Sequence, residues 1–168
     1  MEKDIFSDIP ADIIKKIIEN SPVGIYISDM NGKFVYGNKK AEEIVGYRKE
    51  ELIGKSFKES LLLDLNGIAR ALKLLALNKL GKETGPDEFE LKRKDGTSST
   101  VIIRTKPIEI ENRKFVIGMV EDITERKKME IELKERNEEL EKVQRLTVGR
   151  EIKMVQLKKE IERLKKKD

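Results

Sequence analysis

Two different apolar patterns meet within residues 118–129 (GMVEDITERKKM), and this change constrains the fold more than any other feature of the chain. Up to Asp122 the chain carries a short continuous apolar stretch bounded by charged residues, which is typical of a β-strand. From Arg126 onward apolar residues recur every three or four positions over about five heptads, which is typical of a coiled-coil helix. No Gly or Pro lies between the two patterns. The pattern therefore predicts a folded body joined to a long helix without a flexible residue.

The expected helix carries one apolar seam through residues 126–168, with a weak centre. Thr147 and Arg150 occupy core positions of the heptad, and Gly149 costs about 1 kcal/mol of helix stability relative to Ala. Apolar residues at the a and d positions of a heptad pack against a partner helix. The seam that we expect to hold a homodimer together consists of Met129, Leu133, Leu140, Val143, Met154, Leu157, Ile161 and Leu164.

Charge is distributed unevenly along the chain. Residues 126–168 contain 15 basic and 10 acidic side chains, whereas residues 1–125 contain 21 and 22. Glu residues interrupt the basic tail and lie four positions before Lys or Arg, as Glu130 does before Lys134, and such pairs stabilise a solvated helix. We therefore expect a salt-laced helix surface and no nucleic-acid partner. A DNA-associated transcriptional regulator that uses the basic tail is the alternative.

The chain contains neither Cys nor His, and this excludes several kinds of site. Disulfides, zinc–thiolate sites, Cys nucleophiles and the phosphoacceptor of a histidine kinase all need one of these residues. No phosphate-binding loop is present either, so we predict no catalytic residue, no metal site and no enzyme activity. No stretch reaches the roughly 18–20 apolar residues of a membrane span. These observations lead us to expect a cytoplasmic protein with no membrane partner.

The part before residue 126 predicts an α+β fold built on one antiparallel sheet. An apolar stripe that includes Ile13, Ile14 and Ile17 predicts a short docking helix within residues 1–20. Asn31-Gly32 is the strongest two-residue signal for a β-hairpin, and Asn38 is suited to cap a helix. We expect strands at 23–29, 33–37, 88–94, 98–110 and 113–122, helices at 39–47 and 66–79, and a short helix or turn at 49–57.

Several motifs in this order resemble the PAS (Per-Arnt-Sim) sensor domain. They are Asp29-Met30-Asn31-Gly32, Asn38, Gly46-Tyr47, Glu50 to Lys55 (EELIGK), Lys94-Asp95-Gly96 and Asp122-Ile123-Thr124. The resemblance implies a five-stranded antiparallel sheet with short helices over one face, enclosing a pocket. It also implies that signals leave through a C-terminal helix, often in a parallel dimer. We therefore divide the chain into an N-terminal helix (1–20), a PAS sensor domain (21–125) and a coiled-coil signalling helix (126–168).

Candidate pocket residues are apolar side chains expected to point inward, although a filled core without ligand predicts the same pattern. Ser28, Thr100 and Arg104 would add polarity if they faced inward, which strand alternation alone does not decide. The candidate pocket residues are Ile27, Val35, Ile44, Leu52, Phe57, Ile68, Leu72, Leu75, Ile103 and Val120.

The resemblance also limits the cofactor. Haem-binding PAS domains commonly use a His ligand, and the flavin-adduct and hydroxycinnamate photoreceptors each use a Cys. Because both residues are absent, none of these cofactors is expected. A noncovalent flavin, a small metabolite and an empty domain remain open, so the sequence leaves the cofactor unknown.

The expected signal-transfer junction consists of Asp122, Ile123, Thr124 and Arg126. Asp122 can accept hydrogen bonds from the first helical N–H groups or pair with Arg126, and Ile123 can point into the core. We expect a sensory module that detects a ligand, a redox state or a partner. Its output is expected in trans, in a downstream signalling protein, because the chain lacks both a phosphoacceptor His and room for an ATP-binding domain. A structural dimerisation adaptor without ligand is the second alternative.

Overall fold

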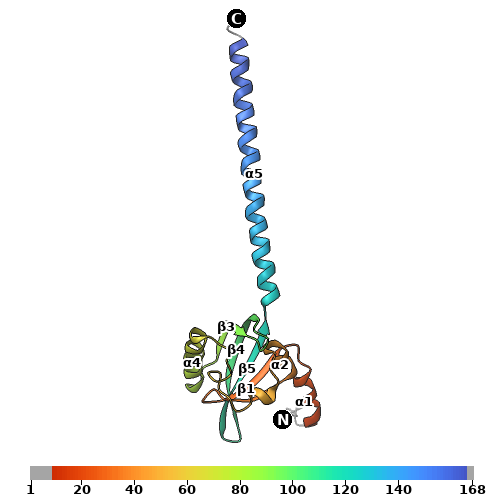
Figure 1. The fold of residues 1–168 in the computed structure, drawn as a ribbon, viewed down its shortest axis with the longest axis vertical. Helices are drawn as coiled ribbons and strands as arrows, with labels where there is room; N and C mark the ends of the chain where they lie inside the picture. Colours follow the sequence, from red (N-terminus) through yellow and green to blue (C-terminus); the bar gives the residue numbers. More distant parts are fainter. Residues whose placement is uncertain (1–8, 166–168) are drawn as a thin grey trace, which may run out of the picture. The chain divides into compact units, whose positions relative to one another are not determined.

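The computed structural model describes residues 9–165, without the side chains of 160, 162, 164 and 165, and it confirms the predicted α+β fold. The five strands form one antiparallel sheet in the order β2-β1-β5-β4-β3 (Figure 1). Residues up to Thr124 form one compact unit, and residues from Glu125 form a second. The strands are β1 (Gly24–Asp29), β2 (Phe34–Gly37), β3 (Thr84–Lys92), β4 (Ser98–Ile110) and β5 (Arg113–Asp122). The helices are α1 (Ala11–Glu19), α2 (Lys39–Val45), α3 (Lys49–Leu52), α4 (Leu65–Lys79) and α5 (Thr124–Lys165).

The predicted first hairpin is present, and local hydrogen bonds close its turn. The Asp29 carboxylate accepts hydrogen bonds from the N–H groups of Asn31 (2.8 Å) and Lys33 (2.9 Å). Gly32 has a φ of +80°, which favours glycine, and a Cβ at this position would lie 2.2 Å from the ring of Phe57. The turn therefore requires glycine for its backbone angle and for its contact with the aromatic ring beside it.

Asn38 connects three segments at the start of α2. Its side-chain oxygen accepts hydrogen bonds from the N–H groups of Ala41 (2.9 Å) and Ile25 (2.8 Å). Its amide nitrogen donates to the carbonyl oxygens of Ile18 (2.9 Å) and Val23 (3.0 Å). The side chain is fully buried, and these four bonds use its whole capacity as donor and acceptor. The predicted helix cap is thus confirmed, and it also holds the end of α1 and the start of β1 in place.

Strand β3 starts earlier than the sequence predicted. The alternation of apolar residues begins near Glu88, but pairing with β4 already begins at Thr84, opposite Thr105. The register shifts between Thr84 and Asp87, where Gly85 and Pro86 interrupt the ladder. Pro has no backbone N–H to donate to the neighbouring strand. The first residues of β3 therefore do not show the alternation of apolar and polar side chains by which a strand is recognised.

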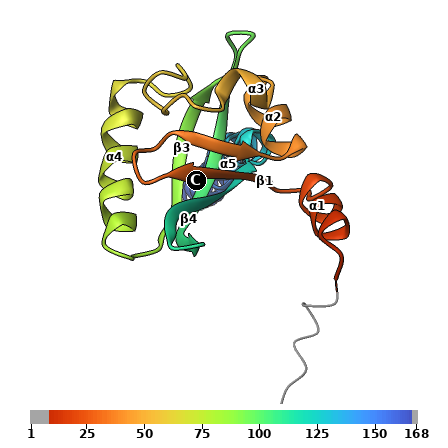
Figure 2. The ribbon, with the colours of Figure 1, turned by 90° about the horizontal axis from the view of Figure 1, so that it is seen from below.

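Helix α1 forms as predicted, but its apolar stripe is not docked within the described chain. Ile13, Ile14 and Ile17 are 44%, 42% and 62% exposed. Instead, only the end of α1 is attached, through Glu19 and the Ile18 carbonyl. Helices α1 and α4 lie on opposite sides of the sheet unit (Figure 2). Within the described residues of a single copy, the docking predicted for Ile13, Ile14 and Ile17 is therefore wrong.

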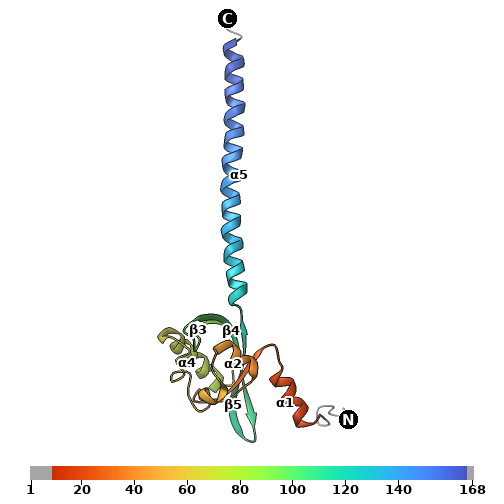
Figure 3. The ribbon, with the colours of Figure 1, turned by 45° about the vertical axis from the view of Figure 1, so that its right-hand side comes forward.

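The core lies between the sheet and the helices that cover its inner face. The buried cluster contains Ile44 from α2, Phe89 and Leu91 from β3, Val101 from β4 and Val120 from β5. The hairpin that joins β4 and β5 extends beyond the rest of the sheet (Figure 3). The buried core therefore lies against β3, β4 and β5, and Tyr26 of β1 packs against it.

Helix α5 contains 42 residues and no break in its helical backbone, even at Gly149. Every one of its side chains from Lys128 to Lys159 is exposed. Among the described residues, no helix is long and apolar enough to cross a membrane.

Candidate functional site

A cavity of about 130 Å³ lies inside the sheet unit. The inner face of the sheet forms one wall, and side chains of α2, α3 and α4 and of the loops beside them form the others. Most of the lining is apolar, and the core residues Ile44, Phe89 and Val120 belong to it. A space of this size is larger than the small voids of an ordinary close-packed core, so it is the candidate ligand site.

Six of the ten predicted pocket residues line this cavity, and four do not. The six come from α2, α3, the following loop, α4, β4 and β5, so the structure brings together side chains that lie up to 76 positions apart in the chain. The lining residues among the ten are Ile44, Leu52, Phe57, Leu75, Ile103 and Val120. Ile27, Val35, Ile68 and Leu72 are absent from the lining.

The prediction for the first hairpin is wrong by one residue in each strand. Tyr26 and Ser28 line the cavity from β1, and Phe34 and Tyr36 line it from β2. Side chains alternate between the two faces of a strand, so Ile27 and Val35 point to the other face, where Val35 is 45% exposed. Both faces of these strands carry apolar side chains, and alternation alone therefore did not identify the inner one.

The prediction for α4 is wrong in a similar way. Ala71, Leu74, Leu75 and Asn78 face the cavity, whereas Leu72 is 39% exposed. Ile68 is half-buried but does not line the cavity. Because α4 has apolar residues around much of its circumference, its spacing predicted the helix but not the buried face.

Polar side chains from three elements meet at the edge of the cavity. The Thr105 hydroxyl donates to the side-chain oxygen of Asn78 (3.0 Å), and the hydroxyl oxygens of Thr84 and Thr105 lie 2.7 Å apart. The Asn78 amide nitrogen donates to the Lys82 carbonyl (2.9 Å). Asn78 is only 2% exposed, so this network fixes α4 against β3 and β4 where unpaired polar groups would be destabilising.

Tyr26 places a phenol in the cavity wall. A Cβ on Gly118 would lie 2.6 Å from its hydroxyl oxygen and 2.2 Å from its ring, so the ring covers the Gly118 backbone. Burial raises the pKa of the Tyr26 hydroxyl to about 12. At neutral pH this group is therefore protonated and is a hydrogen-bond donor.

Tyr36 connects the cavity wall to helix α1. Its hydroxyl donates to the Glu19 carboxylate (2.8 Å), which also accepts a hydrogen bond from the Lys39 N–H (3.1 Å). Burial, and then the hydrogen bond and negative charge of Glu19, raise the pKa of Tyr36 to about 12. The Tyr36 bond is the largest influence on Glu19 and holds the pKa of that carboxyl below its ordinary value.

Sequence reasoning missed the polar lining residues Tyr26, Tyr36, Asn78 and Thr105. One usable signal was Gly118, because a glycine inside a strand often marks the close approach of another group. The register then places Tyr26 and Thr105 on either side of it.

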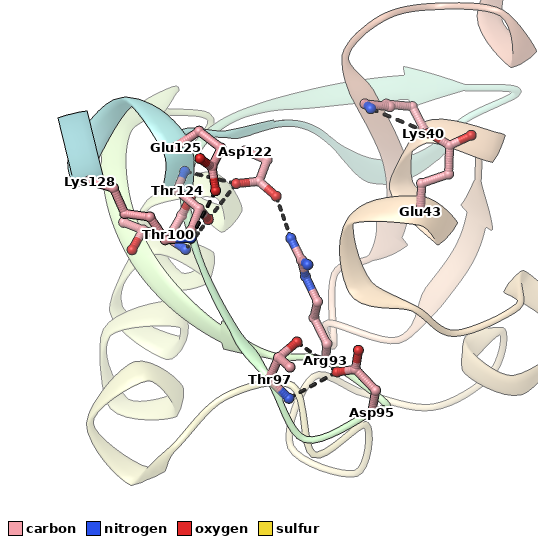
Figure 4. Close-up of polar contacts among 10 residues, drawn as sticks. All are labelled: Lys40, Glu43, Arg93, Asp95, Thr97, Thr100, Asp122, Thr124, Glu125 and Lys128. Atoms are coloured by element: carbon pink, nitrogen blue, oxygen red, sulfur yellow. Dashed lines mark hydrogen bonds and ion pairs between the residues drawn. The ribbon is translucent and has the colours of Figure 1, made fainter.

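The predicted junction is a network of hydrogen bonds at the end of β5 (Figure 4). One oxygen of Asp122 accepts from the N–H (2.9 Å) and the hydroxyl (2.5 Å) of Thr124. The other oxygen accepts from the Arg93 guanidinium (2.6 Å). Thr124 in turn accepts a hydrogen bond from the Thr100 N–H (2.9 Å), and Ile123 is buried. The first residue of α5 is thus bound to β4 and, through Asp122, to the end of β3.

Arg93, rather than Arg126, is the partner of Asp122. Arg126 instead pairs with Glu130 one turn further along α5 (2.9 Å), so the predicted Asp122–Arg126 pair is wrong. Partial burial acts to raise the pKa of Asp122, but the bonds from Thr124 and the charge of Arg93 outweigh it and hold this pKa below its ordinary value.

Of the three polar candidates left open by alternation, only Ser28 lines the cavity. The Thr100 backbone belongs to the junction. Arg104 is exposed and lies 3.9 Å from the Glu121 carboxylate, so it adds no charge to the cavity.

The expected dimer seam is exposed on α5. Its described side chains are between 50% and 61% exposed in the single chain. They are Met129, Leu133, Leu140, Val143, Met154, Leu157 and Ile161, and the side chain of Leu164 lies outside the described residues. Pairing of this seam with a second copy remains a prediction.

Comparison with known proteins identifies a family and relatives that match most of the chain. The family model described as PAS domain matches residues 22–125. Sporulation kinase A of Bacillus subtilis is 30% identical over 128 residues, which cover 76% of this chain and 21% of that protein. A blue-light photoreceptor of Listeria innocua is 30% identical over 138 residues, which cover 79% of this chain and 53% of that protein.

A solved structure shares the fold. The PAS domain of an HTR-like protein from Haloarcula marismortui superposes with a TM-score of 0.59 at 23% identity, covering 67% of this chain and 91% of that one. The chain spans about a fifth and about half of the lengths of the two curated relatives.

Proposed function

Because the chain belongs to the PAS domain family, we propose that it senses a small molecule in the cavity and transmits the change through a dimeric α5 to a signalling partner. The names of the two relatives, a kinase and a blue-light photoreceptor, support a role in sensing. The described residues contain the sheet unit and its helices but no kinase domain. The output therefore belongs to another protein or domain.

One observation carries this proposal. Leu91 and Val120 line the cavity, and the residues two positions further along the chain, Arg93 and Asp122, form the ion pair at the start of α5. Val120 and Asp122 point to the same face of β5, and Arg93 directly follows the last residue of β3. We therefore expect movement of the cavity wall to displace this pair. A ligand that binds one arrangement of the wall better than another shifts the population of that arrangement.

The size of the cavity favours a compact ligand over a flavin. Sites for drug-sized ligands commonly have about 300–1,000 Å³, whereas this cavity has about 130 Å³. A cysteinyl flavin adduct is also excluded, since the chain contains no Cys. The name of the blue-light photoreceptor therefore supports a sensing role for this chain and does not imply a flavin in its cavity.

Dimerisation through α5 is supported by its exposed apolar seam. Isolated solvated helices with this many exposed apolar residues at heptad spacing are stabilised by pairing. Basic side chains on α5 are engaged locally, as in Lys128–Glu125 and Arg145–Glu141. This arrangement favours a paired helix over a phosphate-binding surface.

Two substitutions, at side chains that are almost equally exposed, test whether the chain dimerises through the seam. Leu140 is a seam residue and is 57% exposed, whereas Ile131 lies outside the seam and is 58% exposed. Leu140→Glu places a charge in the core of a coiled coil, but Ile131→Glu places it in water. In sedimentation of the full chain, we expect a dimer for the wild type and Ile131→Glu and a shift to monomer for Leu140→Glu. A monomeric wild type, or the same shift in both variants, would contradict dimerisation through this seam.

Ligand sensing is tested separately by native mass spectrometry of the purified chain. A bound small molecule is expected as an added mass that is lost on denaturation. It is expected to slow hydrogen exchange at the N–H groups of Ile123 and Thr124, which bond to Thr100 and Asp122. Unchanged exchange at these two amides in the liganded protein would refute transmission through the junction.

A further inference from the structure

Polar groups facing the cavity follow one row across the sheet. Tyr26 on β1 pairs with Gly118 on β5, Gly118 pairs with Thr105 on β4, and Thr105 pairs with Thr84 on β3. Since Gly118 has no side chain, the Tyr26 ring extends over it, and its hydroxyl lies about one strand spacing, or ~4.8 Å, from the strand of Thr105. Asn78 bonds to Thr105 from α4. The row therefore brings hydroxyl and amide groups to one end of an otherwise apolar space.

A count of donors and acceptors shows which of these groups are available to a ligand. The Thr105 hydroxyl donates its hydrogen to Asn78, so Thr84 is the donor in the Thr84–Thr105 bond. The Asn78 amide uses one of its two hydrogens on the Lys82 carbonyl. The structure gives the Tyr26 and Ser28 hydroxyls no hydrogen bond to any described residue. Two hydroxyl hydrogens and one amide hydrogen are thus free to bind an acceptor.

The charged side chains in the lining are already engaged elsewhere. The Glu42 carboxylate accepts a hydrogen bond from the Lys49 N–H (2.6 Å), and the Lys49 ammonium lies 3.9 Å from the Glu19 carboxylate. No described cation other than Lys49 lines the cavity. A charged ligand would lose its hydration without gaining a counter-ion, which is strongly unfavourable in an apolar space. The lining therefore selects a neutral molecule.

We propose that the cavity binds a neutral, single-ring molecule with one hydroxyl or carbonyl oxygen, which accepts a hydrogen bond from Tyr26 beside Asn78. The inference rests on the proposed sensing function and names the ligand class for it. An apolar cavity of about 150 Å³ is known to hold benzene, so about 130 Å³ suits a compact ring of this kind. The Tyr26 hydroxyl supplies the specificity, because a ring without oxygen leaves this half-buried donor unpaired.

Phenol, toluene and benzoate are matched probes, because they share the ring but differ in the group that meets Tyr26. Binding to the full chain is measured by calorimetry at neutral pH, with NMR to locate the site. We expect phenol to bind about tenfold more tightly than toluene, because only phenol gains a hydrogen bond with Tyr26 and one such bond changes affinity by about this factor. Benzoate, which is charged at this pH, is expected not to compete with phenol.

Two tyrosine variants assign the effect to one hydroxyl. Tyr26→Phe is expected to abolish the preference for phenol over toluene. Toluene is expected to bind the variant still, which also shows that the cavity is intact. Tyr36→Phe is the control, since the Tyr36 ring lines the same cavity but its hydroxyl bonds to Glu19. It is expected to retain the preference for phenol.

The outcomes separate this inference from the sensing function. Three results would overturn the proposed ligand class while the cavity remains a binding site. They are equal affinity for phenol and toluene, a preference for phenol that survives Tyr26→Phe, and competition of benzoate with phenol. Failure of both neutral probes to bind, together with no copurified molecule in native mass spectrometry, would overturn ligand sensing itself and the inference with it.

Discussion

Replacement of Asp122 by Ala is the most direct perturbation of the junction. It removes two hydrogen bonds to Thr124 and the ion pair with Arg93 at 2.6 Å. Loss of a helix cap costs about 1 kcal/mol. The side chains of Arg93 and Asp122 are 30% and 26% exposed, so we assign the pair about 1–2 kcal/mol, near the lower end for charged hydrogen bonds. The expected loss in free energy of unfolding is therefore about 2–3 kcal/mol.

The β3–β4 turn provides a matched control in the same unit. One oxygen of Asp95 accepts from the N–H (2.9 Å) and the hydroxyl (2.7 Å) of Thr97, which repeats the Asp122–Thr124 pattern (Figure 4). Asp95 forms no ion pair among the described residues. Asp95→Ala therefore removes the two local bonds without breaking an ion pair, and it is expected to destabilise the unit less than Asp122→Ala. The charge of Arg93 also lowers the pKa of Asp95, so the difference between the two variants tests the direct ion pair between Arg93 and Asp122.

Urea denaturation followed by circular dichroism gives both free energies, and a double-mutant cycle isolates the pair. Arg93→Met with Asp122→Asn is expected to give a coupling energy of about 1 kcal/mol or more. In thermal unfolding, Asp122→Ala should lower the melting temperature by roughly 8–12 °C, at about 4 °C per kcal/mol for a unit of this size. Equal losses in Asp122→Ala and Asp95→Ala would refute the idea that β3 is coupled to the start of α5.

Two further predictions concern pH. Because the folded pKa of Asp122 is lowered, its stabilisation is fully present above the unfolded value of about 3.9 and is lost as pH falls through the folded pKa. The stability difference between the wild type and Asp122→Asn should thus be constant above about pH 5 and shrink below about pH 4; a constant difference down to pH 2 would contradict the lowered pKa. The pKa values of Tyr26 and Tyr36 are raised to about 12, so their contribution is present below the unfolded value of about 10 and is lost as pH rises through 12. Absorbance at 295 nm should show both hydroxyls still protonated at pH 11 while the protein is folded, and early ionisation of both would show that they are solvated.

Long-range contacts explain most of the differences between the sequence predictions and the structure. Asn38 was recognised as a cap because its acceptor role is local, but its bond to Ile18 spans 20 residues and had no local signal. The same holds for Arg93 and Asp122, which are 29 residues apart and meet only because β3, β4 and β5 are neighbours. Spacing along the helix offers Arg126, one turn away, as one possible partner of Asp122, yet Arg126 pairs with Glu130.

The sequence alone was enough for the features that depend on neighbouring residues. The hairpin at Asn31-Gly32, the helix at Asn38, the three late strands and the change of repeat after Asp122 all follow from short-range backbone preferences and apolar spacing. Only the tertiary structure decided which face of each element is internal, because alternation and helical spacing define two faces without saying which one is covered. That choice put Tyr26 and Asn78 at the cavity and turned Ile27 and Leu72 away from it. It depends on the order of strands in the sheet and on close packing across it, which join residues that are distant in the chain.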